Sequence, residues 1–183
     1  MRDAVTALNH AQFDGFAKIT EIGPIGMISL RAKPDVVGLA DAIKAATGTT
    51  VPAQRQIVVN GANAAGWMSP DEYLLILPYD QTGPALVGLS LALQGQHHLA
   101  AVVSDARAVF RIEGVKADQV LAKLSPVDLG RMAPGELRRT RAAQVAVAFW
   151  RDGDGFSLVC FRSMAAYVMG LLQASARPGS EIY

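Results

Sequence analysis

Residues 144–162, QVAVAFWRDGDGFSLVCFR, contain two apolar segments that are separated by a short polar turn. The segments at 144–150 and 156–162 are rich in β-branched and aromatic residues, which favour strands. Asp152-Gly153-Asp154-Gly155 lies between them, and such residues adopt the backbone conformations that a tight turn requires. Because a tight turn makes its two strands antiparallel neighbours, this stretch predicts a hairpin within an antiparallel sheet.

The chain around this hairpin predicts further elements of the same kind. RAVFRIEG (107–114) is typical of a strand, and the apolar residues of 117–124 recur at helical spacing up to Pro126. The Arg- and Pro-rich stretch that follows Pro126 is expected to be a loop. A last helix is expected from Ser163 onwards.

The first half of the chain shows a comparable alternation of strands and helices. Helix 83–95 is apolar on nearly every side, so we expect it to be buried or docked on a partner. Ser104-Asp105-Ala106 indicates a tight connection to the strand at 107–114. The predicted elements of this half are strands at 26–31, 55–60, up to Trp67, 72–78 and 98–103, and helices between Pro34 and Gly48 and at 83–95.

These elements favour an α+β fold with mainly antiparallel sheets and crossover helices. Two ferredoxin-like halves, each a split βαβ unit, account for the order, at about 26–104 and 105–176 within a single domain 26–176. Residues 1–25 show no clear period and are expected to form an N-terminal arm that packs on something else. Residues 177–183 are expected to form a C-terminal tail.

The composition narrows the classes of function. The 183 residues carry 17 basic and 16 acidic side chains, a net charge of +1, which gives no long-range field for nucleic acid or an anionic membrane. The N-terminal residues lack the apolar core of a signal peptide, and no apolar run is long enough for a membrane span. The single cysteine fits a reducing compartment, so we expect a cytoplasmic protein.

Two acidic residues in GWMSPDEYLLILP (66–78) are the first candidates for catalysis. Asp71 and Glu72 are adjacent, so on an extended chain they point to opposite sides and cannot act together on one substrate. Their position directly after Ser69-Pro70 favours a turn in which side chains bond nearby amides.

The other reactive side chains are also explained more simply by structure. His97 and His98 are adjacent and have no third ligand at a suitable spacing, so a solvated strand start is favoured over a metal site. Cys160 lies mid-strand, where a buried small hydrophobe is favoured over a nucleophile. Because GxGxxG and P-loop motifs are also missing, the sequence predicts no catalytic, cofactor-binding or metal-ligating residue in this chain.

Four arginines in GRMAPGELRRTR form the strongest local concentration of charge: Arg131, Arg138, Arg139 and Arg141. Such a cluster is either a solvated face or a contact for an acidic partner surface or the anionic tail of a ligand. A partner interface is the sharper hypothesis.

Several segments, taken in order, resemble the γ subunits of heterotetrameric sarcosine oxidases over roughly residues 26–173. The specific features are Trp67-x-x-Pro70-Asp71-Glu72, Ser104-Asp105, Pro126-x-Asp128-Leu129, Pro134-Gly135 and Arg162-Ser163. The resemblance implies a fold similar to the folate-binding domain of the aminomethyltransferase of the glycine-cleavage system. It also implies a subunit without catalytic residues of its own.

The same resemblance implies partners and cofactors. The complex oxidatively demethylates sarcosine to glycine and passes the one-carbon unit to tetrahydrofolate or releases it as formaldehyde. Alpha, beta and delta subunits are the expected partners, and FAD, FMN, NAD and tetrahydrofolate are expected on them. Whether the isolated chain forms a homo-oligomer, and whether the substrate is sarcosine or another N-methyl amino acid, stays open.

The sequence departs from the family pattern at two places, and one of them bears on the alternative of a folate-binding protein. Met132 stands where the family leads us to expect an aromatic residue, which concerns packing more than function. In TRAAQVAVAFWRD (140–152) there is no Gly-Gly before the strand expected at 144–150, and that strand contains no acidic residue. No folate site is therefore carried over from the aminomethyltransferase relatives. The alternative function is a folate-binding, aminomethyltransferase-like protein, motivated by the related fold and by the arginines, which could receive a glutamyl tail.

Overall fold

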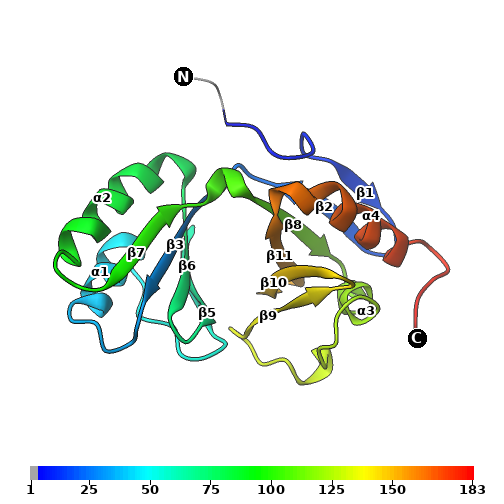
Figure 1. Cartoon of the computed structure of the whole chain (residues 1–183). Coiled ribbons are helices and arrows are strands. Elements are labelled where there is room, and N and C mark those ends of the chain that lie inside the picture. The colour runs from blue at the N-terminus through cyan, green and yellow to red at the C-terminus, as the bar shows by residue number, and fades with distance from the viewer. Residues whose placement is uncertain (1–3) are drawn as a thin grey trace. The chain divides into compact units, whose positions relative to one another are not determined.

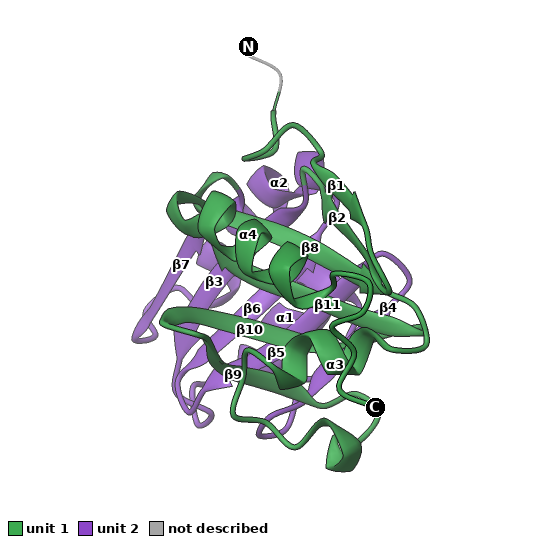
Figure 2. Cartoon of the chain, turned by 90° about the vertical axis from the view of Figure 1, so that its right-hand side faces the viewer, with its two compact units in different colours: residues 1–24, 105–183 green, residues 25–104 purple. Residues whose placement is uncertain are grey.

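The computed structural model describes residues 4–183, which form two compact units (Figure 2). Unit 2 is continuous and comprises Ile25–Ser104, whereas unit 1 combines the N-terminal residues up to Pro24 with Asp105–Tyr183. Each unit has its own antiparallel sheet and its own apolar core. The predicted α+β class is therefore confirmed.

Unit 2 contains a five-stranded sheet in the order β4-β5-β6-β3-β7, with helices α1 and α2 packed on it (Figure 1). Its elements are β3 (Gly26–Ala32), α1 (Leu39–Thr47), β4 (Ile57–Asn60), β5 (Asn63–Ser69), β6 (Glu72–Leu77), η1 (Tyr79–Gln81), α2 (Thr82–Ala92), β7 (His98–Val102) and η2 (Ser104–Ala106), the last of which continues into unit 1.

The ends of α1 follow from glycine conformation. Gly38 precedes the helix with φ 81° and Gly48 follows it with φ 72°, and both angles are unfavourable for residues with a Cβ. The predicted stop at Gly48 is therefore confirmed, while the start at Leu39 lies later than Pro34 suggested. The helix buries Leu39, Ala42 and Ile43 against the sheet.

Unit 1 contains a six-stranded sheet in the order β1-β2-β8-β11-β10-β9, with α3 and α4 in contact with β11. Its elements are β1 (Gln12–Asp14), β2 (Lys18–Ile22), β8 (Arg107–Glu113), α3 (Ala117–Ala122), η3 (Leu129–Arg131), β9 (Leu137–Ala142), β10 (Val145–Asp152), β11 (Gly155–Phe161), η4 (Arg162–Met164) and α4 (Ala165–Ser175).

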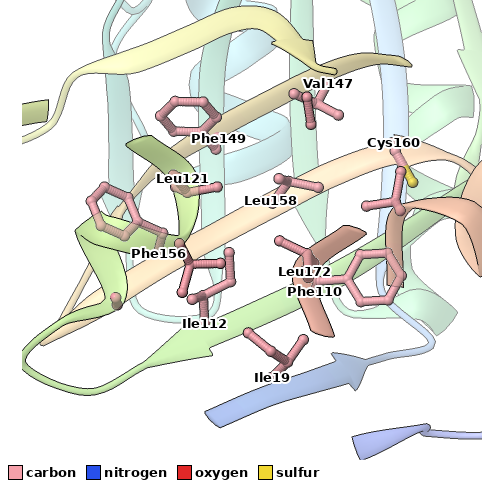
Figure 3. Close-up of a cluster of buried hydrophobic side chains, with 14 of the residues drawn as sticks. Ile19, Phe110, Ile112, Leu121, Val147, Phe149, Phe156, Leu158, Cys160 and Leu172 are labelled. Carbon is pink, nitrogen blue, oxygen red and sulfur yellow. The ribbon is translucent and has the colours of Figure 1, made fainter. Parts of the chain in front are cut away.

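The core of unit 1 joins side chains from the sheet and both helices (Figure 3). Phe110 on β8, Leu158 on β11 and Leu172 on α4 are fully buried. Phe149 and Phe156 meet edge to face with ring centroids 6.1 Å apart, an arrangement that aromatic pairs prefer. The hairpin predicted at 144–162 is thus confirmed as β10 and β11, and it supplies much of this core.

The two sheets share one arrangement of strands. In unit 2 the sequence β3-α1-β5-β6-α2-β7 gives the spatial order β7-β3-β6-β5, with β4 added at the edge. In unit 1, β8-α3-β10-β11-α4 gives β8-β11-β10, with β9 added at the edge. The place beside β8 that corresponds to β7 is taken by β2, which pairs with β8 in antiparallel register. The split βαβ arrangement is present twice, and in unit 1 the N-terminus completes it.

Residues 1–3 of the N-terminal arm expected at 1–25 lie outside the described residues, and the rest of that arm up to Pro24 belongs to unit 1. Ile19 of β2 is fully buried against the core, opposite Ile112 of β8. The alternating apolar pattern of a strand was not recognisable in the sequence of β2, because the next inward-facing residue after Ile19 is the charged Glu21, whose side chain is also buried. Its carboxylate accepts hydrogen bonds from the backbone N–H groups of Leu8 at 2.9 Å and His10 at 3.1 Å, which satisfies the buried charge.

Two other expectations, for the loop after Pro126 and for the C-terminal tail, need correction. The predicted loop after Pro126 contains strand β9, which was missed because three arginines interrupt its apolar pattern. The tight connection expected at Ser104–Ala106 is present as η2, and it joins β7 and β8, which belong to different sheets. The C-terminal tail expected at 177–183 is tied to α3, because the Gln119 side chain bonds the backbone of Ile182 and Tyr183. Within residues 4–183, no helix is long and apolar enough to cross a membrane.

Candidate functional site

Asp71 lies in the turn between β5 and β6, as expected, and Glu72 begins β6. The expectation that the two side chains point apart is wrong, because both carboxylates lie beside the guanidinium of Arg31 on β3. The Arg31 guanidinium lies 3.7 Å from Asp71 Oδ2 and 3.2 Å from Glu72 Oε2. Asp71 also accepts a hydrogen bond from Ser69 Oγ at 2.9 Å, and Glu72 accepts one from Ser29 Oγ at 3.3 Å. The two carboxylates therefore fasten the turn to the neighbouring strand.

The corresponding turn of unit 1 is built in the same way around Arg111 of β8. Its guanidinium lies 3.8 Å from Asp152, the last residue of β10, and 3.5 Å from Asp154 in the β10–β11 turn. Asp152 also accepts a hydrogen bond from Ser157 Oγ at 2.7 Å. The Asp152–Gly155 stretch is therefore a hairpin turn fastened by an arginine, as the turn at Asp71 is.

Cys160 lies on β11 with 3% of its surface exposed, among the core residues of unit 1 (Figure 3). Burial raises the pKa of its thiol to about 12, although the Arg107 charge lowers it in part. A thiol with this pKa is protonated at neutral pH and is a poor nucleophile. The prediction of a buried small hydrophobe is confirmed.

His97 and His98 lie where α2 connects to β7. His97 is exposed, and the ring of His98 bonds the carbonyl oxygen of Gln96 at 3.0 Å. No group of three or more His, Cys, Asp or Glu side chains that could hold a metal ion occurs among residues 4–183.

The arginine cluster predicted as an interface is divided by the structure. Arg138 on β9 forms an ion pair of 2.7 Å with Glu136, whose side chain is 8% exposed. Glu136 also accepts a hydrogen bond from the backbone N–H of Ala133 at 2.9 Å. Arg138 thus has a structural role that its position in a run of arginines concealed.

The remaining arginines of the cluster point elsewhere. Arg131 is highly exposed and forms a local ion pair of 3.3 Å with Asp128. Arg139 and Arg141 are exposed and occupy alternate positions of β9, so they share one side of this edge strand. Of the four arginines, these two give the edge of the unit 1 sheet its positive charge.

Unit 2 contains surface pockets that the sequence did not predict, and two of them differ in their linings. One, of about 400 Å³, is lined by prolines and aromatic rings, including Pro34, Pro52, Trp67 and Tyr73. The other, of about 390 Å³, lies between α1 and α2 and is lined mainly by small residues such as Ala42 and Gly88. Neither lining includes a charged side chain, so both suit mainly apolar groups.

Comparisons with known proteins found one matching family and several similar solved structures. Residues 31–177 match the model of the family described as sarcosine oxidase, gamma subunit. No curated protein matches the sequence significantly. A chain of heterotetrameric sarcosine oxidase from Corynebacterium sp. U-96, in complex with pyrrole 2-carboxylate, superposes with a TM-score of 0.80 at 26% identity, over 90% of this chain and 87% of that chain.

A second solved structure shows the breadth of the fold. Aminomethyltransferase T of the glycine cleavage system from Bartonella henselae superposes with a TM-score of 0.64 at 14% identity. The match covers 86% of this chain and 45% of that chain, so it concerns one part of the larger protein. At this identity the likeness shows the fold alone, which is the fold that the sequence led us to expect.

Proposed function

Because the chain belongs to the sarcosine oxidase gamma subunit family, we propose that it is a non-catalytic subunit of a heterotetrameric sarcosine oxidase. In this role it stabilises the flavin-bearing subunits, which oxidatively demethylate sarcosine to glycine. The observation that carries the proposal is the family match over residues 31–177 together with the likeness, over 90% of the chain, to a chain of such an oxidase.

The side-chain geometry supports a role in assembly. The carboxylates that suggested catalysis hold arginines of neighbouring strands, as Asp71 and Glu72 hold Arg31. The Cys160 thiol is buried and protonated. These groups have structural partners or are buried, and in this proposal the chemistry falls to other subunits.

Partners and cofactors follow from the same proposal. The partners are the alpha, beta and delta subunits, and FAD, FMN, NAD and tetrahydrofolate are held by those subunits. A cytoplasmic location, which the single cysteine favours, belongs to the proposal as well.

Co-expression tests the proposed assembly. The affinity-tagged chain is expressed together with the remaining oxidase subunits of its own organism and purified through the tag. We expect the flavin-bearing subunits to elute with it in equal amounts, with their flavin absorbance. Elution of the tagged chain alone would contradict the proposal.

Titration separates the proposal from the folate alternative. We expect the isolated chain to release no saturable heat when tetrahydrofolate is added to micromolar concentrations in a calorimeter. Saturable binding to the isolated chain would instead favour the aminomethyltransferase-like function.

A further inference from the structure

The two sheets have four edges, and three of them carry features that discourage further strand pairing. Strand β9 carries Arg138, Arg139 and Arg141. Strand β1 has three residues and ends in Asp14, and β4 has four residues. Charges and short edge strands are common means of preventing unwanted association. Strand β7 has five residues, HLAAV, with no Asp, Glu, Lys, Arg or Pro among them.

The backbone of β7 has hydrogen-bonding groups along the outer edge of the sheet that could pair with another strand. Val103 N–H donates to the carbonyl oxygen of Met27 at 2.8 Å, which fixes which residues of β7 bond to β3. By the alternation of an antiparallel ladder, Leu99 and Ala101 also bond inward, and His98, Ala100 and Val102 direct their N–H and C=O groups away from β3. No backbone partner for those outward groups occurs among residues 4–183.

The side chains around this edge are apolar and exposed. Leu99 is 60% exposed and Val102 is 42% exposed, and they lie on opposite faces of the sheet because their positions differ by an odd number. The neighbouring helix α2 exposes Val87 and Leu91, at 59% and 68%. Residues 81–104, which include α2 and β7, contain no Asp, Glu, Lys or Arg. Such depletion of charge is characteristic of the central part of protein interfaces.

We propose that the open edge of β7 binds an extended, uncharged segment of another oxidase subunit, which adds to the sheet of unit 2 as a further strand. The inference rests on the proposed function and specifies where one partner docks. Backbone hydrogen bonds to His98, Ala100 and Val102 supply the affinity in this mode, and side chains on both faces supply the selectivity.

The chemistry of the edge selects the kind of segment. A charged segment would lose hydration beside Leu99 and Val102 without gaining an ion pair from β7. The cation opposite Leu99 in the ladder, Arg31 of β3, is already paired with Asp71 and Glu72. An apolar segment gains burial on both faces of the sheet. A different subunit, and not a second copy of this chain, is the occupant because the family is that of one subunit of a hetero-oligomer, to which the related solved chain also belongs.

Lysine substitutions test the side-chain requirement. In the co-purification with the remaining oxidase subunits, the double variant Leu99→Lys/Val102→Lys is compared with the wild-type chain. We expect the amount of partner subunit that co-purifies with the variant to fall by about tenfold or more, because two ammonium groups would be buried at the new strand pair. Val59→Lys is the matched control, since Val59 is 61% exposed on β4, at the opposite edge of the same sheet. It should retain partner like the wild type.

A proline substitution tests the backbone requirement independently. Ala100→Pro removes an N–H that points away from β3, so the native ladder keeps its bonds while strand addition is blocked. We expect the same loss of partner as with the lysine variant. Circular dichroism and thermal unfolding of each isolated variant show that the loss does not reflect unfolding.

The outcomes separate this inference from the proposed function. If the wild-type chain retains no partner, the proposed function fails. If the wild type and both folded edge variants retain partner equally, the function stands and the docking edge is overturned. Light scattering on the isolated chain gives a further overturning result, namely a wild-type dimer that the edge variants convert to monomers while the oxidase complex is unaffected.

Discussion

Units 1 and 2 repeat one strand arrangement but complete it differently. In unit 2 the last strand of the arrangement is β7, which follows α2 directly and remains an edge. In unit 1 the equivalent place is taken by β2 from the N-terminus, which is covered in turn by β1. Unit 1 thereby pairs both sides of its added strand within the chain, whereas unit 2 leaves one side of its own strand open.

The side chains of the two strands agree with this difference. Strand β2 buries Ile19 and Glu21 completely or nearly so, and Glu21 anchors the segment before β1 through backbone hydrogen bonds. Strand β7 has no fully buried residue and exposes Leu99. The comparison teaches that β2 serves folding, while β7 has surface left for a partner.

Among substitutions that test this comparison of β2 with β7, Ile19→Ala on β2 should change the free energy of unfolding most. Removing a fully buried isoleucine side chain should lower the free energy of unfolding by about 2–5 kcal/mol. Val102→Ala on β7 is the control, and it should lower that free energy by less than about 1 kcal/mol because Val102 is 42% exposed. Urea unfolding monitored by circular dichroism measures both values. Equal values would remove the distinction between the two strands.

Glu21→Ala should have the next largest effect. The substitution removes the acceptor of the Leu8 backbone N–H and leaves the His10 N–H with Thr6 Oγ1 as its acceptor, and one unsatisfied buried donor costs about 1–3 kcal/mol. Glu113→Ala, which removes a partly exposed carboxylate 3.8 Å from Arg111, should cost less than about 1 kcal/mol. The same urea experiment measures both, and a Glu21 effect as small as that of Glu113 would show that the anchor is unimportant for folding.

Substitutions of two arginines of β9 should also differ in their effect on stability, by less than the substitutions on β2 and β7 do. Arg138→Ala removes the cation from the buried Glu136 carboxylate and should lower the unfolding temperature by several degrees. Arg141→Ala should leave the unfolding temperature nearly unchanged, because exposed arginines contribute little to folding, and should instead weaken retention of partner subunits. Differential scanning calorimetry and co-purification provide the two measurements. The opposite order of thermal effects would mean that the ion pair to Glu136 contributes nothing.

The smallest effect concerns the pH dependence of unit 1. The Cys160 thiol has a folded pKa of about 12, against roughly 8.5 in an unfolded chain. Above about pH 8.5 the unfolded chain loses this proton while the folded chain keeps it, so stability should decline as pH rises towards 12. Urea unfolding of the wild type and Cys160→Ala between pH 8 and 10 should show a shallower decline in the variant. Identical slopes would indicate that the thiol is not buried in solution.

The sequence was sufficient to predict the elements whose apolar pattern is uninterrupted. The β10–β11 hairpin, the end of α1 at Gly48 and the turn at Asp71 all follow from local rules of alternation, glycine conformation and turn chemistry. Strands β2 and β9 were missed because each carries charge where the pattern requires an apolar residue. In β2 the backbone of Leu8 and His10 compensates the charge of Glu21, whereas in β9 Arg138 pairs with the nearby Glu136 and the other two arginines are exposed.

The candidate site could be predicted less well than the fold. That Arg138 pairs with Glu136, whereas Arg139 and Arg141 lie along an edge, depends on strand β9, which the sequence did not indicate. Likewise, α2 was expected to be buried or docked from its composition, but the exposed edge of β7 beside it follows from sheet order. Sheet order depends on the pairing of β3 with both β6 and β7, which local sequence patterns do not encode.

The central claim is that this chain stabilises an oxidase whose chemistry resides in other subunits. The most direct test is to purify the remaining subunits with and without this chain and to compare sarcosine oxidation and its half-life on heating. We predict that the preparation without the chain loses activity much faster on heating and that adding the purified chain restores its half-life. Equal activity and equal half-life in the two preparations would contradict the account.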